Sequence, residues 1–291
     1  MLDNSIFAHS QFAEPANGPQ GPRFGVHNQH YLVCGFIRKK LDHNIEYQAQ
    51  MDSLFTIGRL IREGRFEAFT YCELEYESMK RFIGESVFDA LDHCRVTDCP
   101  PAIERSRFQQ GNFFNLIRKG DKEDKKLGVP TALSQITFMQ MLCDSDRLWY
   151  PWVLGVKDLL GLTDFEIDSF RNLACFRKLC AVSQSSENYP DMFHLWTAQR
   201  NHMDVFLTLE KKLPKIGNQI EKSKQIGVEY PTKVRRPIEF LHSIGITDLD
   251  PVPIEPGRFY PFGEVWDSWQ CECRRQKGGA PDRAGTQATA S

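Results

Sequence analysis

The chain has 291 residues, a formal net charge of −2 and 41% hydrophobic residues, which is ordinary for a globular protein of one large or two small domains. A charge this close to zero excludes an overall nucleic-acid-binding signature, so any phosphate-binding surface must be local. No apolar run approaches the roughly 18 residues of a membrane span, and the start lacks the basic and apolar regions of a signal peptide.

The first third of the chain predicts short strands and helices in alternation. Residues 1–9 predict a short strand with its exit, and the Gly-, Pro- and Asn-rich residues 14–30 predict a loop. Apolar positions at helical spacing predict a helix over 45–63, for which Gly64 is the expected C-cap. Residues 66–70 then predict a strand, and a second helix is expected to begin at its end.

The rest of the chain is mainly helical in pattern. Residues 95–127 predict loops, and the mixed charges at 118–126 are typical of a solvated face. Helices are expected over 132–143, 151–160, 163–182 and from Pro190 to about Arg200. The prolines of 236–269 favour irregular structure, and 276–291 lack an apolar pattern and predict disorder.

The most informative stretch is 188–210. Pro190 suits the first turn of a helix, and Asp191 follows it, where the helix dipole stabilises a carboxylate. Val205–Leu207 is a short apolar run of the kind found in buried parallel strands, and Glu210 follows it closely. Because ligand sites in open α/β sheets lie at the carboxyl ends of strands, these two acids are expected to converge on one cation.

This stretch resembles the C-terminal half of the PIN-domain nuclease motif. The family pattern is a helix beginning Asp-x-x-His-x-x-x-Ala, an apolar strand, and Leu-Thr-x-acid. Here it reads Asp191-Met-Phe-His194-Leu-Trp-Thr-Ala198, then Phe206-Leu-Thr208-Leu-Glu210. The family usually has aspartate at the last position, so Glu210 is a departure, although glutamate still offers metal-binding oxygens.

The resemblance implies further acids at other strand ends, since Mg²⁺ prefers several oxygen ligands. Asp3, in Asp3-Asn-Ser5, is similar to the family's first acid, with the alternative that it caps a turn. Glu73 is similar to the family's Thr-x-x-Glu-Leu glutamate, although Thr70 and Glu73 also form a capping-box pattern. Glu77, one turn further on, is the substitute if Glu73 only caps the helix.

Two neighbours of these acids are left outside the metal set. His194 is expected to be a packed residue that could orient a nearby carboxylate. Thr208 has two open interpretations, a hydrogen bond to a metal-bound water or to phosphate, or a helix cap.

The resemblance implies an α/β fold, a three-layer α/β/α sandwich with a central, mainly parallel sheet and helical or loop insertions. It also implies a metal-dependent endoribonuclease that hydrolyses RNA phosphodiesters with Mg²⁺ or Mn²⁺, of the sort found as toxins or in RNA processing. The expected catalytic residues are Asp3, Glu73 and Asp191, and Glu210 joins them as a metal ligand. The alternative is a PIN-like binding or scaffold module that has lost catalysis.

The expected organisation is a nuclease domain over 1–235 with an insertion around 95–150, an irregular extension packed on it over 236–275, and a disordered tail over 276–291. RNA is the expected partner, with a homodimer or an inhibitory protein left open and no membrane. The nine cysteines, an odd number without paired C-x-x-C spacing, favour reduced thiols over disulfides or zinc and indicate a cytoplasmic protein.

Overall fold

The computed structural model describes residues 1–17, 34–79, 88–108, 135–145, 149–183, 185–222 and 232–261. Within them, helices alternate with short strands, and two of the strand pairs are parallel, so the expected α/β class is confirmed at that level. The contacts divide the chain into two units. One contains residues 1–11 and 42–252, and the other contains 12–41 and 253–291.

The smaller unit contains an antiparallel sheet in the order β1–β2–β7. Its strands are β1 (Ala13–Asn17), β2 (Cys34–Arg38) and β7 (Phe259–Pro261). Gly35 of β2 faces Pro261, where an added Cβ would lie 2.3 Å from the carbonyl oxygen of Tyr260, so only glycine permits this close approach. The expected loop over 14–30 is therefore wrong for residues 14–17, and 18–30 lie outside the described residues.

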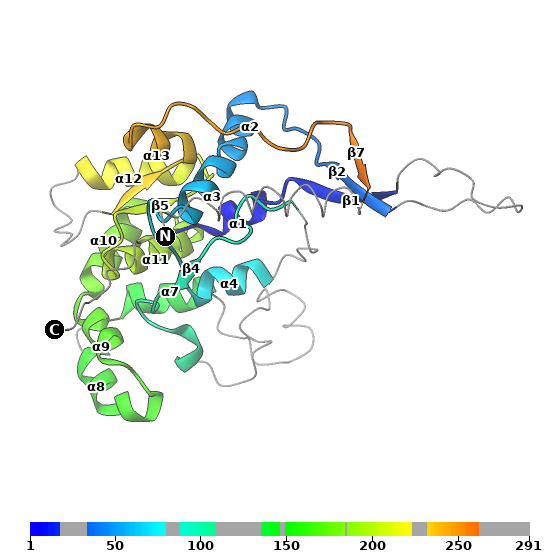
Figure 1. Ribbon diagram of the computed structural model, residues 1–291. Helices are drawn as coiled ribbons and strands as arrows, with labels where there is room; N and C mark the ends of the chain where they lie inside the picture. Colours follow the sequence, from blue (N-terminus) through cyan, green and yellow to red (C-terminus); the bar gives the residue numbers. More distant parts are fainter. Residues whose placement is uncertain are drawn as a thin grey trace, which may run out of the picture. The chain divides into compact units, whose positions relative to one another are not determined.

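The larger unit contains two pairs of parallel strands. These are β3 (Ala68–Thr70) with β4 (Val96–Asp98), and β5 (Val205–Leu207) with β6 (Lys233–Arg235). Leu2 donates to the carbonyl of Phe69, and Asp3 donates to that of Leu207, both at 2.9 Å. Residues 1–3 therefore lie between β3 and β5, and Leu2 pairs with Leu207 in the parallel sense (Figure 1).

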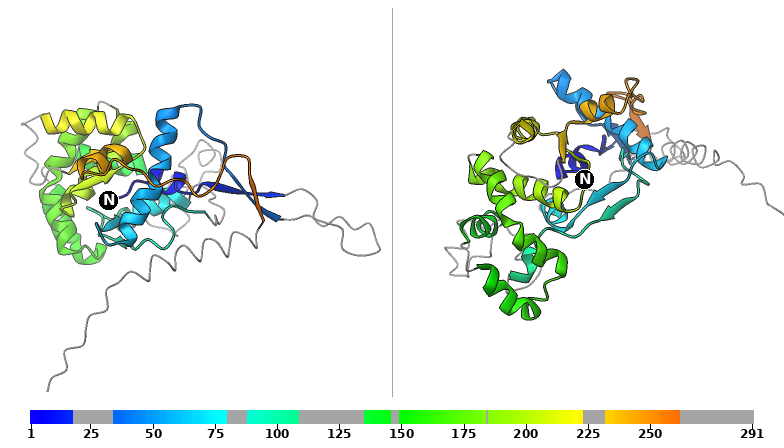
Figure 2. Two further views of the ribbon diagram at one scale, coloured as in Figure 1. Left: turned by 45° about the horizontal axis from the view of Figure 1, so that its top comes forward. Right: turned by 90° about the vertical axis from the view of Figure 1, so that its left-hand side faces the viewer.

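The helices of this unit fall into two groups by their mutual contacts. The first group contains α7 (Gln135–Asp144), α8 (Trp149–Leu160), α9 (Asp164–Arg171), α10 (Leu173–Ser183), α11 (Tyr189–Arg200) and α12 (Lys212–Lys222). The second contains α2 (Ile45–Asp52), α3 (Leu54–Arg62) and α13 (Pro237–Ser243), while α1 (Asn4–His9) contacts α4 (Cys72–Met79) (Figures 1 and 2). Short 3-10 turns lie at Arg105–Phe108 and Ser186–Asn188.

A cluster of buried aromatic rings fixes the position of α11. Trp196 is 1% exposed and stacks on Phe176 at 5.2 Å between ring centroids. Phe193 meets the same two rings edge to face, at 5.7 Å from each. Such ring pairs contribute about 0.5–1.5 kcal/mol each beyond the area they bury. The helix that carries Asp191 and His194 is thus held firmly against α10.

Several boundaries differ from the expected ones. The helix expected over 45–63 is broken at Ser53, and that over 163–182 is broken at Asn172. β4 lies within the expected insertion, and α13 is a helix where irregular structure was expected. Gly64 does follow α3, with a φ of +68° that favours glycine. The tail over 276–291 lies outside the described residues.

The length and polarity of the helices bear on membrane insertion. Among the residues that the structure describes, no helix is both long and apolar enough to cross a bilayer.

Candidate functional site

Asp3 lies at the carboxyl end of the first strand segment and is 8% exposed. Its Oδ2 accepts hydrogen bonds from the hydroxyl of Ser5 at 2.5 Å and from that of Thr208 at 2.7 Å. Thr208 directly follows β5 and is fully buried. The Thr208 hydroxyl thus contacts Asp3, while its expected bond to a metal-bound water or phosphate stays a prediction.

The chain turns sharply after β5 and brings Glu210 to the same end of the strands. The backbone amide of Leu209 donates to the Ser5 hydroxyl at 3.0 Å, and that of Glu210 donates to the Thr208 hydroxyl at 3.1 Å. These bonds fix the backbone of the turn, while Glu210 itself is exposed to solvent. Asp3 and Glu210, far apart in the sequence, are therefore linked through two hydroxyl groups.

Asp191 joins this end of the sheet from the first turn of α11. Its burial and then the charges of Glu210, Asp3 and Glu77 together raise the pKa of the carboxyl to about 7, against the opposing effect of His194. Carboxylates shift each other's pKa in this way when they share a site. Asp191 is thus close enough to Asp3 and to Glu210 for the charge of each to act on its carboxyl.

Glu77 and His194 form a buried polar network beside these acids. His194 Nε2 lies 3.0 Å from Glu77 Oε1, and its Nδ1 lies 2.5 Å from the hydroxyl of Tyr71. Burial would lower the pKa of His194, but the charge and hydrogen bond of Glu77, with the charges of Asp3 and Asp191, raise it to about 9. The imidazole is therefore protonated at neutral pH and can donate from both nitrogens. It orients Glu77, as expected of a packed histidine near a carboxylate.

Glu73 is not brought into this cluster, which corrects its expected role as a catalytic and metal-binding residue. Its carboxylate is 1% exposed and accepts bonds from Arg105, 2.9 Å from Nε and 3.0 Å from Nη2. A carboxylate bound on both oxygens by a buried guanidinium is already neutralised, so we assign Glu73 a structural role. Glu77, one turn later on α4, takes its place near Asp191.

The donor chemistry of the cluster fits a hard divalent cation, since it consists of carboxylate oxygens beside hydroxyl groups. The side chains are not preassembled for it, because no group of three or more His, Cys, Asp and Glu among the described residues is arranged to hold a metal ion. Neighbouring carboxylates repel one another in the absence of a cation. Convergence at binding distance would therefore require the carboxylates to move relative to one another.

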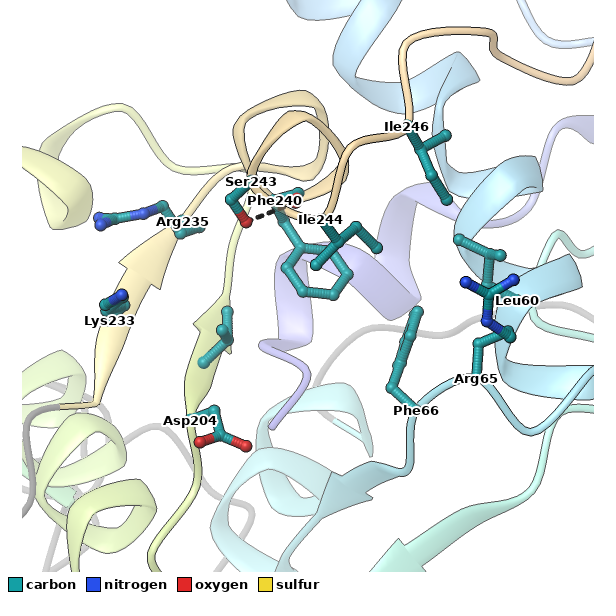
Figure 3. A pocket seen from close by; sticks show the side chains of 11 residues that line it. Leu60, Arg65, Phe66, Asp204, Lys233, Arg235, Phe240, Ser243, Ile244 and Ile246 are labelled. Carbon is teal, nitrogen blue, oxygen red and sulfur yellow. Dashed lines mark hydrogen bonds between the residues drawn. The ribbon is translucent and has the colours of Figure 1, made fainter.

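A cavity of about 680 Å³ lies at the opposite, amino end of β5 and β6 (Figure 3). Phe66 and Phe240 form one wall, with ring centroids 5.1 Å apart, and Asp204 lies at its edge where β5 begins. Lys233 and Arg235 project from β6 at its side. Asp204 thus precedes β5 and lies at the other end of this strand from Thr208 and Glu210.

Comparison with known proteins adds no relative: no protein-family model, no curated protein and no solved structure matches this chain. The interpretation of the site rests on its geometry and on the motif resemblance.

The sequence gives no signal that Tyr71 belongs to the site. The sequence places it only one residue after the strand over 66–70, and no local pattern pairs it with His194, 123 positions later. In the sequence, Ser5 stands out only as part of the Asp3-Asn-Ser5 tripeptide. In the structure, its hydroxyl contacts both Asp3 and the turn after β5.

The raised pKa of Asp191 predicts a pH-dependent stability. The folded pKa is about 7 against an ordinary value of 3.8, so the folded state retains a proton that the unfolded state releases between these values. The free energy of unfolding should therefore fall as the pH rises from about 4, by at most about 4 kcal/mol in total. Urea unfolding in EDTA at a series of pH values measures this slope.

Asp191→Asn should flatten that slope, and a saturating divalent cation should reverse it in the wild type, because the cation competes with protons for the carboxylates. Measurements between about pH 4 and 6 separate Asp191 from His194, whose titration lies higher. An unchanged slope in the Asp191→Asn protein would contradict the assignment.

Proposed function

We propose that this protein is a metal-dependent endoribonuclease with a PIN-like fold. One observation supports this most directly: the Asp191 carboxyl is influenced by the charges of Asp3 and Glu210, which come from two other, distant segments of the chain. Clustered carboxylates of this kind are the usual ligands of Mg²⁺ and Mn²⁺ in enzymes that act on phosphates.

The proposed fold is one central sheet with helices on both faces. The hydrogen bonds of residues 1–3 to Phe69 and Leu207 support the strand order β4–β3–(1–3)–β5–β6. The two helix groups would form the outer layers, with α10–α12 on one face and α2, α3 and α13 on the other. In this arrangement residues 1–3 form the central strand, and Asp3 ends it at the switch point where ligands bind in open α/β sheets.

In the proposed mechanism, Asp3, Asp191 and Glu210 hold Mg²⁺ or Mn²⁺, and Glu77 supplies a further oxygen in place of Glu73. When bound, the cation lowers the pKa of water and stabilises charge on the attacking and leaving oxygens of a phosphodiester. Ser5 and Thr208 orient the Asp3 carboxylate through their hydrogen bonds. Protonated His194 holds Glu77 and offsets part of the negative charge of the cluster.

The test is cleavage of a fluorescent single-stranded RNA by the full chain. We expect cleavage with Mn²⁺ or Mg²⁺, none in EDTA, and recovery when excess Mn²⁺ is restored. In parallel, Mn²⁺ should raise the melting temperature of the protein, because a ligand that binds only the folded state stabilises it. Cleavage that persists in EDTA would remove the metal-dependent mechanism.

The second candidate is a PIN-like binding or scaffold module without catalysis. What favours it is the saturation of Asp3 Oδ2 by two hydroxyl groups, together with the lack of a preassembled metal group among the described residues. A protein that binds RNA and Mn²⁺ without cleaving the RNA would match this alternative. RNA is the proposed partner in both cases, in the cytoplasm, and a homodimer or an inhibitory protein of the toxin–antitoxin kind is compatible with either.

A further inference from the structure

Arg236 is a buried cation with an unused hydrogen-bonding edge. It directly follows β6 and is 6% exposed. Its Nη1 donates to Glu46 of α2, but Nε and Nη2 are buried and have no hydrogen-bond partner among the described residues. Nε and Nη2 together form the side edge of the guanidinium, from which two parallel N–H groups point in the same direction.

A buried charged donor without a partner is unfavourable, because it loses its water without gaining a protein hydrogen bond. Such groups in folded proteins therefore call for a bound water, ion or ligand. Two parallel N–H groups match the two oxygens of a phosphate or a carboxylate. The edge is thus shaped for an oxyanion rather than for a neutral group.

The location of Arg236 connects it to the acid cluster. Leu2 pairs with Leu207, and Leu207 pairs with Arg235, so the following residues Asp3, Thr208 and Arg236 continue one row across the carboxyl end of the strands. The amide of Thr208 donates to the carbonyl of Arg235 at 3.0 Å, which supports this register. Neighbouring strands lie about 5 Å apart, so the backbones of Asp3 and Arg236 are roughly 10 Å apart.

A second cation lies close to Arg236. Lys211 directly follows Glu210 and is exposed. It acts on the same carboxylate as Arg236, since a hydrogen bond and the charge of Arg236, and then the charge of Lys211, all lower the pKa of Glu46. Both cations therefore act on Glu46, which Arg236 contacts directly.

We propose that the Nε and Nη2 edge of Arg236 binds a backbone phosphate of the RNA strand next to the acid cluster. The inference deepens the proposed function, because it names the residue that positions the substrate strand. Phosphates recur at every nucleotide of a strand, so one strand can place one phosphate at Arg236 while another reaches the acids.

The experiment measures binding without cleavage. A short fluorescent single-stranded RNA is titrated with the full-length Asp191→Asn protein over a series of salt concentrations. Arg236→Met in this background should weaken binding about tenfold and reduce the salt slope by about one, because one phosphate contact is lost. Arg236→Lys should fall between the two, since it retains the charge and loses the paired donors.

Arg235→Met is the matched control. Arg235 neighbours Arg236 in sequence but pairs with Glu221 at 3.4 Å and lines the cavity that also contains Phe66 and Phe240. It should change RNA affinity less than about twofold. Inorganic phosphate and a glutamate-rich peptide serve as competitors of RNA binding. We expect phosphate to compete in the Asp191→Asn parent, which retains Arg236. The peptide should compete more weakly per negative charge.

The outcomes separate this inference from the proposed activity. The phosphate assignment would be overturned if the parent and Arg236→Met proteins bound RNA with equal affinity, or if Arg235→Met and Arg236→Met lost equal affinity. It would also be overturned if the protein did not bind RNA, or if the peptide competed better than phosphate. Arg236-dependent binding in a protein whose wild type does not cleave RNA with Mn²⁺ would support the phosphate site and reject the nuclease. Circular dichroism and melting temperature establish that each variant is folded.

Discussion

Asp191→Asn should lower Mn²⁺-dependent RNA cleavage about a thousandfold while the protein remains folded. The amide side chain would retain the size and one oxygen of the carboxylate but lose the charge that draws a divalent cation into the cluster. A metal ion contributes several kcal/mol of transition-state stabilisation, and about 4 kcal/mol corresponds to a thousandfold in rate. Initial rates at saturating Mn²⁺ measure the loss.

The matched control for this substitution is Asp204→Asn. Asp204 lies at the amino end of β5, beside the cavity and away from the acid cluster, so its amide variant should cleave RNA within about twofold of the wild type. Unlike the cleavage rate, the stability of Asp191→Asn should increase. Without metal at neutral pH, its free energy of unfolding should exceed that of the wild type, because a buried carboxylate near other negative charges has been removed. Equal cleavage by the two amide variants would exclude Asp191 from the active site.

Glu73→Gln should destabilise the protein by about 3–5 kcal/mol, since it leaves the buried Arg105 guanidinium without its counter-charge. The side chains of Glu73 and Arg105 are 1% and 2% exposed, so water does not screen the loss. Urea unfolding at neutral pH measures the difference. If Glu73 were instead a metal ligand, its removal in EDTA would leave stability unchanged or improved.

A second pair of variants tests the same assignment. Glu73→Leu combined with Arg105→Met should recover most of the lost stability, because apolar side chains of similar volume often replace a buried ion pair at little cost. Glu77→Gln should cost less stability, since the Glu77 side chain is 21% exposed, but should reduce cleavage by about tenfold or more. A Glu73→Gln protein that folds normally and cleaves RNA poorly would reverse the roles assigned to Glu73 and Glu77.

Local patterns in the sequence were sufficient for the segment that carries Asp191. Pro190 and Asp191 lie in the first turn of α11, the polar residues from Arg200 end it, and Val205–Leu207 form β5 as expected. Thr163 and Glu166 form a capping box at the start of α9, another feature of this local kind. Each of these features depends on residues within a few positions of one another, where propensity and capping act.

Short strands are harder to predict from the sequence than the helix that carries Asp191. β4 has three residues, Val96-Thr-Asp98, and only one of them is apolar, so nothing local distinguishes it from a loop. Its pairing with β3 supplies the missing stabilisation. In the same way, β1 contains Pro15 and Asn17 and forms only because β2 aligns with it, from Ala13 with Arg38 to Asn17 with Cys34.

The amino-acid sequence by itself determined the position of each acid within its own helix or strand. Asp3 follows two apolar residues, Asp191 lies in the first turn of α11, and Glu210 lies just past β5. Which acids meet was decided only in three dimensions. Glu73 and Glu77 lie one turn apart on α4, and their different roles arise because Arg105 and His194, 32 and 117 positions away, approach them separately. Charge pairing over such separations depends on packing, which no local pattern encodes.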